Sequence, residues 1–123
     1  MKRIIVLVGL FLLMLSCISQ DKQVKQVSVN NLQEVLSTNK AQLLDVRTPK
    51  EWEQGIIEGA IKINLFEENF EEEVLEKLTK EKPVYVYCRT GGRSSKASEL
   101  LLKNGFEVYN VAGGYNEWKL KNK

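Results

Sequence analysis

Short strand-like stretches alternate with amphipathic helical stretches along most of the chain, and this alternation constrains the fold more than any other feature. The strongest strand signal is Pro83 to Cys88, which is largely β-branched and aromatic and is therefore expected at the centre of a sheet. Further strands are predicted over residues 42–46, 60–65 and 106–111. Strands that alternate with helices across short loops are typical of parallel sheets covered by helices on both faces. The sequence therefore predicts a three-layer α/β fold with a central parallel sheet of about five strands.

Four helical stretches accompany these strands. The first begins after Ser28, a favourable N-cap residue, and the second runs from Phe66 to Leu78. The third covers Ser94 to Lys103 and ends before Gly105, and the fourth follows Gly113-Gly114. The apolar side chains expected to face inward in the second helix are Phe66, Phe70, Val74, Leu75 and Leu78. Its many glutamates are interpreted as a solvated face rather than a binding surface.

Composition limits the possible functions. The chain has 123 residues, 43% of them apolar and 28% charged, which suits one globular domain without internal repeats. Positive and negative side chains balance beyond Cys17, so we expect no nucleic-acid binding. The sequence has no histidine, which excludes Cys-His hydrolase chemistry and argues against a zinc site. We expect a monomer that needs neither metal nor cofactor.

The N-terminus has the pattern of a secretory signal. Lys2 and Arg3 precede an apolar run of about 12 residues, which is shorter than the ~20 residues of a membrane-spanning helix. The run ends in Leu-Ser-Cys17 and resembles a bacterial lipoprotein signal, although Met14 and Leu15 depart from the usual form. The resemblance implies cleavage before Cys17 and lipidation of that residue. The alternatives are an ordinary secretory signal, removed together with Cys17, and an uncleaved anchor.

These features predict a signal peptide over residues 1–16, a polar tether over residues 17–26 and one domain over residues 27–123. The protein is then expected in the bacterial cell envelope, in the periplasm, held at a membrane by its lipid alone. So short a tether would keep the domain, and with it the rim of the sheet described next, close to that membrane. The exported part would contain a single cysteine, Cys88, which cannot close an internal disulfide.

Three motifs follow three of the predicted strands and are expected to meet at one rim, because ligands of open α/β sheets bind beyond the carboxyl ends of the strands. The motifs are Asp45-Val46-Arg47, Cys88-Arg89-Thr90 and Ala112-Gly113-Gly114. In the second motif, Gly91 and Gly92 are expected to adopt positive φ values, so that the loop from Cys88 to Ser94 turns its N–H groups inward. Such a loop, continued by the start of a helix, would stabilise a thiolate or a persulfide without a base.

The run Cys88-Arg-Thr-Gly-Gly-Arg-Ser94 resembles the active-site loop of rhodanese-type sulfurtransferases. The first signature of that family is similar to Asp45-Val-Arg taken together with Glu51-Trp52 and residues 55–60. The last signature of the family is similar to Gly113-Gly114 taken together with Trp118. The likeness covers residues 27 to 121, and Ile56 departs from it because the family usually has histidine there. It implies the rhodanese-like fold and a persulfide on Cys88. The substrate-binding residues that it implies are Arg89, Thr90, Gly91, Gly92, Arg93 and Ser94.

The residues around the loop have less specific roles. Asp45 and Arg47 are expected to support the rim, Asp45 by accepting hydrogen bonds from loop or arginine donors or else by capping a turn. Arg47 and Glu51 are expected to form a structural ion pair, and Trp118 is expected in the core. Arg89 is expected either to attract anionic donors or to remain solvated.

The main hypothesis is a sulfurtransferase that moves a sulfane sulfur from a small donor such as thiosulfate to a thiol, cyanide or an envelope protein. One alternative is a binding or regulatory module without turnover. Another is a phosphatase or arsenate reductase. Phosphatase loops, however, have five residues between the cysteine and the arginine, and the longer loop leaves room for a phosphoryl group. Only four residues separate Cys88 from Arg93 here, which favours a single sulfur atom over a phosphoryl group.

Overall fold

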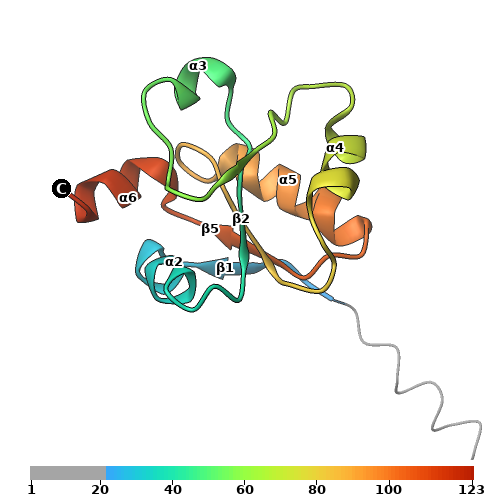
Figure 1. Cartoon of the computed structure of the whole chain (residues 1–123), viewed down its shortest axis with the longest axis horizontal. Coiled ribbons are helices and arrows are strands. Elements are labelled where there is room, and N and C mark those ends of the chain that lie inside the picture. Colours follow the sequence, from blue (N-terminus) through green and yellow to red (C-terminus); the bar gives the residue numbers. More distant parts are fainter. Residues whose placement is uncertain (1–21) are drawn as a thin grey trace, which may run out of the picture.

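The computed structural model describes residues 22–123 (Figure 1). The predicted signal peptide and Cys17 lie outside the described residues. The strands are β1 Lys25–Val27, β2 Gln42–Asp45, β3 Ile61–Lys62, β4 Val84–Tyr87 and β5 Val108–Val111. The helices are α2 Val29–Leu36, α3 Pro49–Trp52, α4 Phe70–Lys77, α5 Gly92–Lys103 and α6 Gly114–Lys121.

The five strands form one sheet in the order β1-β5-β4-β2-β3, and every neighbouring pair is parallel. The prediction of a parallel sheet of about five strands is therefore confirmed. β4 is the central strand, as its composition predicted, and all four of its residues are buried. Because the strands are parallel, their carboxyl ends lie along one edge, where β2 continues into the Asp45 motif and β4 into Cys88.

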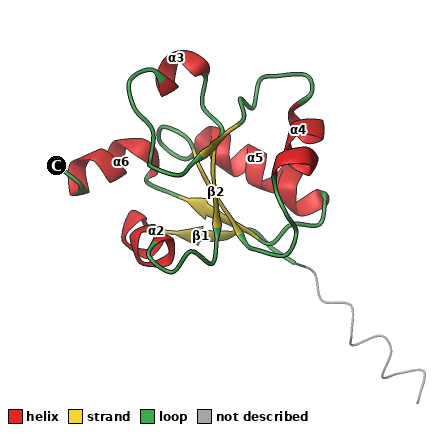
Figure 2. Cartoon of the chain, viewed as in Figure 1, coloured by secondary structure: helices red, strands yellow, loops and turns green. Residues whose placement is uncertain are grey.

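The sheet separates two apolar cores, and helices cover both of its faces (Figure 2). Alternate residues of β4 point to opposite faces, so that Val84, Val86 and Cys88 contribute to one core and Tyr85 and Tyr87 to the other. The first core is completed by buried residues of α4 and α5, among them Phe70, Val74, Ala97 and Leu101. The second is completed by residues of α2 and α6, including Val29, Leu32 and Tyr115.

Local capping fixes the start of two helices, one of them at the N-cap residue that the sequence predicts. The side chain of Ser28 accepts a hydrogen bond from the Asn31 N–H (3.1 Å) and caps α2. Thr48 and Glu51 form a reciprocal capping box at the start of α3, with Pro49 in its first turn. This short helix holds Glu51 next to the edge of the sheet at which the strands end.

The structure corrects three expectations. Lys25 and Gln26, assigned to the tether, belong to β1, so the folded domain begins before residue 27. Phe66 is 68% exposed, because the helix begins at Phe70 and Phe66 lies in a preceding turn closed by its N–H to Asn64. Leu75 is 49% exposed, since it follows the inward-facing Val74 by one residue, or about 100° around the helix. Among residues 22–123, none of the helices has the length and apolar character needed to cross a membrane.

Candidate active site

Cys88 directly follows β4, and its sulfur lies inside a ring of loop donors. The residue is 1% exposed, and the N–H of Gly91 donates to the sulfur at 3.1 Å. Burial alone raises the pKa of the thiol. The surrounding polar groups of Ser94, Gly91 and Thr90 outweigh it, so that the pKa of Cys88 lies below its ordinary value. The Ser94 hydroxyl itself donates to the Gly91 carbonyl oxygen (3.1 Å) and so also holds the turn of the loop. The loop thus turns a backbone donor toward the sulfur, and its stabilisation of a thiolate stays a prediction.

The two loop glycines have different roles. Gly91 has φ +117°, and a Cβ at this position would lie 2.6 Å from the carbonyl oxygen of Ala112. Gly92 does not have a positive φ, and a Cβ there would meet nothing within 4 Å. The expectation that both glycines adopt positive φ is therefore wrong for Gly92, which is simply the first residue of α5. Gly91 alone creates the turn that points its N–H at the sulfur.

The Gly113-Gly114 motif places the start of α6 directly against the cysteine loop. The N–H of Tyr115 donates to the Cys88 carbonyl (2.8 Å), and the N–H of Asn116 donates to the Arg89 carbonyl (3.1 Å). Gly114 has φ +59°, and a Cβ at this position would lie 2.5 Å from the carbonyl oxygen of Arg89. A larger residue would separate α6 from the loop. The motif therefore fixes the position of the loop through its backbone.

Asp45 and Arg47 form a buried pair at the end of β2. The Asp45 carboxylate accepts hydrogen bonds from the Arg47 Nε (3.0 and 3.1 Å), from its Nη2 (2.8 Å) and from its backbone N–H (2.9 Å). Burial alone lowers the pKa of Arg47, but Asp45 outweighs it and the pKa is raised. The Arg47 guanidinium also donates to the Gly55 carbonyl (2.8 Å) and lies 4.2 Å from the Tyr115 ring centroid. Asp45 thus accepts hydrogen bonds from an arginine, one of the partners expected for it, and the supporting roles of the two residues stay a prediction.

The partner predicted for Arg47 is wrong, because Glu51 pairs with Arg93 instead. The Arg93 guanidinium donates to both carboxylate oxygens of Glu51, at 2.6 and 2.8 Å. This bidentate pair lowers the pKa of Glu51 to about 2 and raises that of Arg93. Arg93, predicted to bind the substrate anion, thus connects α5 to α3 through its pair with Glu51.

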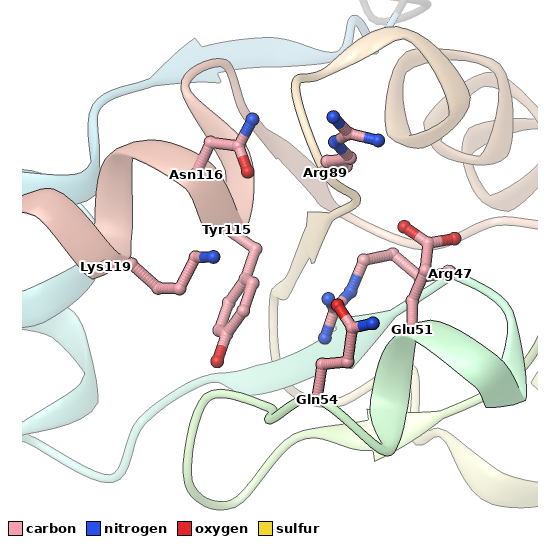
Figure 3. A pocket seen from close by; sticks show the side chains of 7 residues that line it. All are labelled: Arg47, Glu51, Gln54, Arg89, Tyr115, Asn116 and Lys119. Carbon is pink, nitrogen blue, oxygen red and sulfur yellow. The ribbon is translucent and has the colours of Figure 1, made fainter.

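A cavity of about 250 Å³ lies beside the cysteine loop at the carboxyl edge of the sheet (Figure 3). The residues that line it are Arg47, Glu51, Gln54, Arg89, Tyr115, Asn116 and Lys119. Of the predicted substrate-binding residues, Arg89 is in this lining, whereas Thr90, Gly91, Gly92, Arg93 and the buried Ser94 are not. Cys88 does not line this cavity either. Gln54, Tyr115, Asn116 and Lys119 were not predicted from the sequence. Tyr115, Asn116 and Lys119 follow the Gly-Gly motif at helical spacing, which is the signal that could have found them.

The described residues contain no group of three or more His, Cys, Asp or Glu side chains placed to hold a metal ion. What the site offers is a nucleophilic sulfur, a set of amide donors and a cavity rich in cations. These features fit the binding and transfer of an anionic sulfur compound.

Residues 28–121 match the family model described as the rhodanese-like domain. The chain belongs to the rhodanese-like family. Over 80 residues it is 44% identical to the uncharacterized protein YqhL of Bacillus subtilis, covering 64% of this chain and 61% of that protein. It is 34% identical over 96 residues to the thiosulfate sulfurtransferase GlpE of Coxiella burnetii, covering 77% of this chain and 87% of the relative.

The fold is also that of solved rhodanese-like structures. The human single-domain sulfurtransferase TSTD1 superposes with a TM-score of 0.68 at 27% identity, covering 82% of this chain and all of TSTD1. Several relatives are much longer than this rhodanese-like chain. A tRNA uridine(34) hydroxylase of Chlamydia trachomatis is 37% identical over 119 residues, but the match covers only 36% of that protein. Members of the family thus carry different activities on a shared domain.

Proposed function

We propose that this rhodanese-like domain is a sulfurtransferase that carries a sulfane sulfur on Cys88. The observation that supports this most is the buried cysteine sulfur, held by the Gly91 N–H at 3.1 Å, with its pKa lowered by loop donors. A thiolate is the nucleophile in sulfur exchange, and the lowered pKa of Cys88 favours it in a chain without histidine. The likeness to proteins named sulfurtransferases supports the same reading.

The proposed reaction has two displacements. With thiosulfate, the Cys88 thiolate attacks the outer sulfur of the donor. A Cys88–sulfur bond forms as the donor S–S bond breaks, and sulfite leaves with the bonding electron pair. The persulfide anion on Cys88 retains the negative charge, which the N–H groups of the loop stabilise as they do the thiolate. In the second displacement an acceptor thiolate or cyanide attacks the outer sulfur, and the Cys88 thiolate is restored.

Mass spectrometry tests this proposal directly. The protein incubated with thiosulfate should gain the mass of one sulfur on Cys88, and cyanide or a reducing thiol should remove it. Cys88→Ser should lose both the adduct and turnover while remaining folded. If no sulfane donor changes the mass of Cys88, the proposal is wrong and a binding or regulatory module without turnover becomes the better explanation.

We further propose that the protein is exported to the bacterial cell envelope and anchored there by a lipid on Cys17. The support is the sequence of the N-terminus, with its two basic residues, its short apolar run and a cysteine directly after Ser16. The acceptors would then be small thiols or envelope proteins. Cys17→Ser should release the protein from the membrane fraction or block its processing. Unchanged fractionation and processing of this variant would contradict the anchor and leave the sulfurtransferase proposal unaffected.

A further inference from the structure

We propose that the open edge of β3 is a docking site for an extended polypeptide segment of another protein, which pairs with the backbone of β3. The site is a second cavity, of about 340 Å³, between α3, the end of β3 and the start of α4. It has no lining residue in common with the cavity beside the cysteine loop, and it does not depend on the chemistry proposed for Cys88.

The first observation is that β3 has free backbone groups. It is the outermost strand of the sheet and pairs with β2 alone among the described strands. Just after β3, the Ile63 N–H donates to the Asp45 carbonyl of β2 (3.0 Å). Successive residues of an extended chain direct their backbone groups to opposite sides, so those of Lys62 and Asn64 point away from β2. The Asn64 N–H accordingly has no acceptor within residues 22–123.

The second observation is that the cavity follows this open edge. Residues 62–64 line it, and so do Asn69, Glu73 and Lys77 of α4 and its N-cap. The latter three are four residues apart, so they form a stripe of about 12 Å along one face of the helix. An extended segment rises about 3.3 Å per residue, and about three or four of its residues would match that stripe. The site therefore has the length and the backbone donors that an added strand requires.

The third observation is an aromatic wall on α3. Pro49 and Trp52 are three residues apart on this helix, and both line the cavity. The indole N–H of Trp52 is buried and has no acceptor among the described residues, although nearly all buried donors in proteins have one. An apolar surface with an unsatisfied donor beside it fits an apolar side chain and a carbonyl of a bound peptide.

The fourth observation defines the kind of segment. The Lys62 ammonium lies 5.7 Å from the centroid of the Trp52 ring and forms no salt bridge within residues 22–123. Glu67 of the same lining forms none there either, whereas Glu73 and Lys77 pair with each other (3.1 Å). Lys62 and Glu67 are thus left for charges of a partner. The segment that fits has an acidic side chain for Lys62, a basic one for Glu67 and an apolar one for Trp52.

These side chains matter because the strand itself is short. β3 has two residues, and a short edge strand with a lysine is poorly suited to unselective pairing with other chains. The backbone of β3 therefore sets the extended form of the partner, and the charges and the aromatic wall select its sequence.

The probe for the test is a library of random nonapeptides displayed on phage and selected on the full-length protein. A synthetic copy of the most enriched peptide is then titrated against Trp118→Phe, in which Trp52 is the only tryptophan. We expect the peptide to change the fluorescence of Trp52. Methylation of alternate backbone nitrogens of the peptide should abolish binding, because an added strand is held by its main-chain hydrogen bonds.

The charge requirement is tested with two variants of the same charge change. Lys62→Glu should weaken binding of the peptide at least about fivefold, the factor that one exposed ion pair contributes. Lys50→Glu is the matched control, because Lys50 is an exposed residue of α3 that does not line the cavity, and it should bind the peptide as the unaltered protein does.

Three results would overturn the docking site: a library that yields no binder, a bound peptide that leaves Trp52 fluorescence unchanged, and equal affinity of Lys62→Glu and Lys50→Glu. None of them would bear on the sulfurtransferase proposal, which is tested separately through the mass of Cys88.

Discussion

Replacing Gly91 by alanine tests whether the loop backbone, rather than the cysteine alone, creates the reactive thiolate. Gly91 has φ +117°, a conformation that costs a residue with a side chain on the order of 1–3 kcal/mol. The new Cβ would also lie 2.6 Å from the Ala112 carbonyl oxygen, a backbone atom that cannot rotate away. We therefore expect Gly91→Ala to lower the free energy of unfolding by about 3 kcal/mol, which corresponds to a decrease in Tm of roughly 12–24 °C for a domain of this size.

Gly92→Ala is the control for that experiment. A Cβ at Gly92 meets nothing within 4 Å, and alanine is the better helix former, so the variant should be as stable as the unaltered protein or slightly more so. Urea unfolding provides the free energies. The rate of alkylation of Cys88 against pH should also shift to higher pH in Gly91→Ala, because the 3.1 Å bond from Gly91 to the sulfur is displaced. Equal stability of the two variants would refute the reasoning.

Three further predictions concern the groups around the loop. Ser94→Ala should move the pH dependence of Cys88 alkylation to higher pH, because the Ser94 side chain lowers the Cys88 pKa and its hydroxyl holds the Gly91 carbonyl in the loop (3.1 Å). Asp45→Asn should cost about 3–5 kcal/mol in urea unfolding, because it leaves the buried Arg47 without its counter-ion. Glu51, with its pKa lowered to about 2, should contribute about 1–2 kcal/mol to the free energy of unfolding. This contribution should be fully present above pH ~4.5 and should be lost as the pH falls through 2. Thermal unfolding of Glu51→Gln should lack this acid-dependent loss of stability.

Each of these has a control or a contrary outcome. Glu117→Gln, which removes a surface ion pair, should lower the free energy of unfolding by less than about 0.5 kcal/mol. If Asp45→Asn lowered the free energy of unfolding by no more than this, burial of the Asp45–Arg47 pair would be unimportant. An alkylation profile unchanged by Ser94→Ala would mean that the backbone donors alone lower the thiol pKa. A Glu51→Gln variant with the acid response of the unaltered protein would place that response elsewhere.

The fold was predictable because its signals are local. The composition of β4 predicted its central place, and Ser28 marked the start of α2. The cysteine loop was predictable for the same reason, since its donors lie within a few residues of the sulfur in sequence. The prediction of which residues of the acidic helix face inward was wrong in part. Phe66 lies in the turn before Phe70, so it does not continue the helical spacing of the inward-facing residues.

The ion pairs were not predictable from sequence spacing. Arg47 and Glu51 are four residues apart, a spacing that brings side chains together inside a helix. Thr48, however, is the N-cap of α3, so Arg47 lies outside that helix and turns inward to Asp45. Glu51 then meets Arg93, 42 residues away, a contact that depends on where the fold places α3 relative to α5. Lys119 was missed for the same reason, because the packing of α6 against the loop decides which of its faces borders the cavity.

The topology also changes where the active rim would lie on an anchored protein. The chain enters the sheet through β1 (Figure 1), whose Lys25 is at the amino edge. The cavity, in contrast, lies at the carboxyl edge. With a lipid on Cys17, residues 18–24 could span at most ~25 Å, which is less than the ~33 Å diameter of a compact domain of about 100 residues. The tether is then too short to bring the opposite edge round to the membrane. On the proposed anchor the cavity therefore faces the aqueous side, and not the membrane as the length of the tether alone suggested, so that donor and acceptor approach Cys88 from solution.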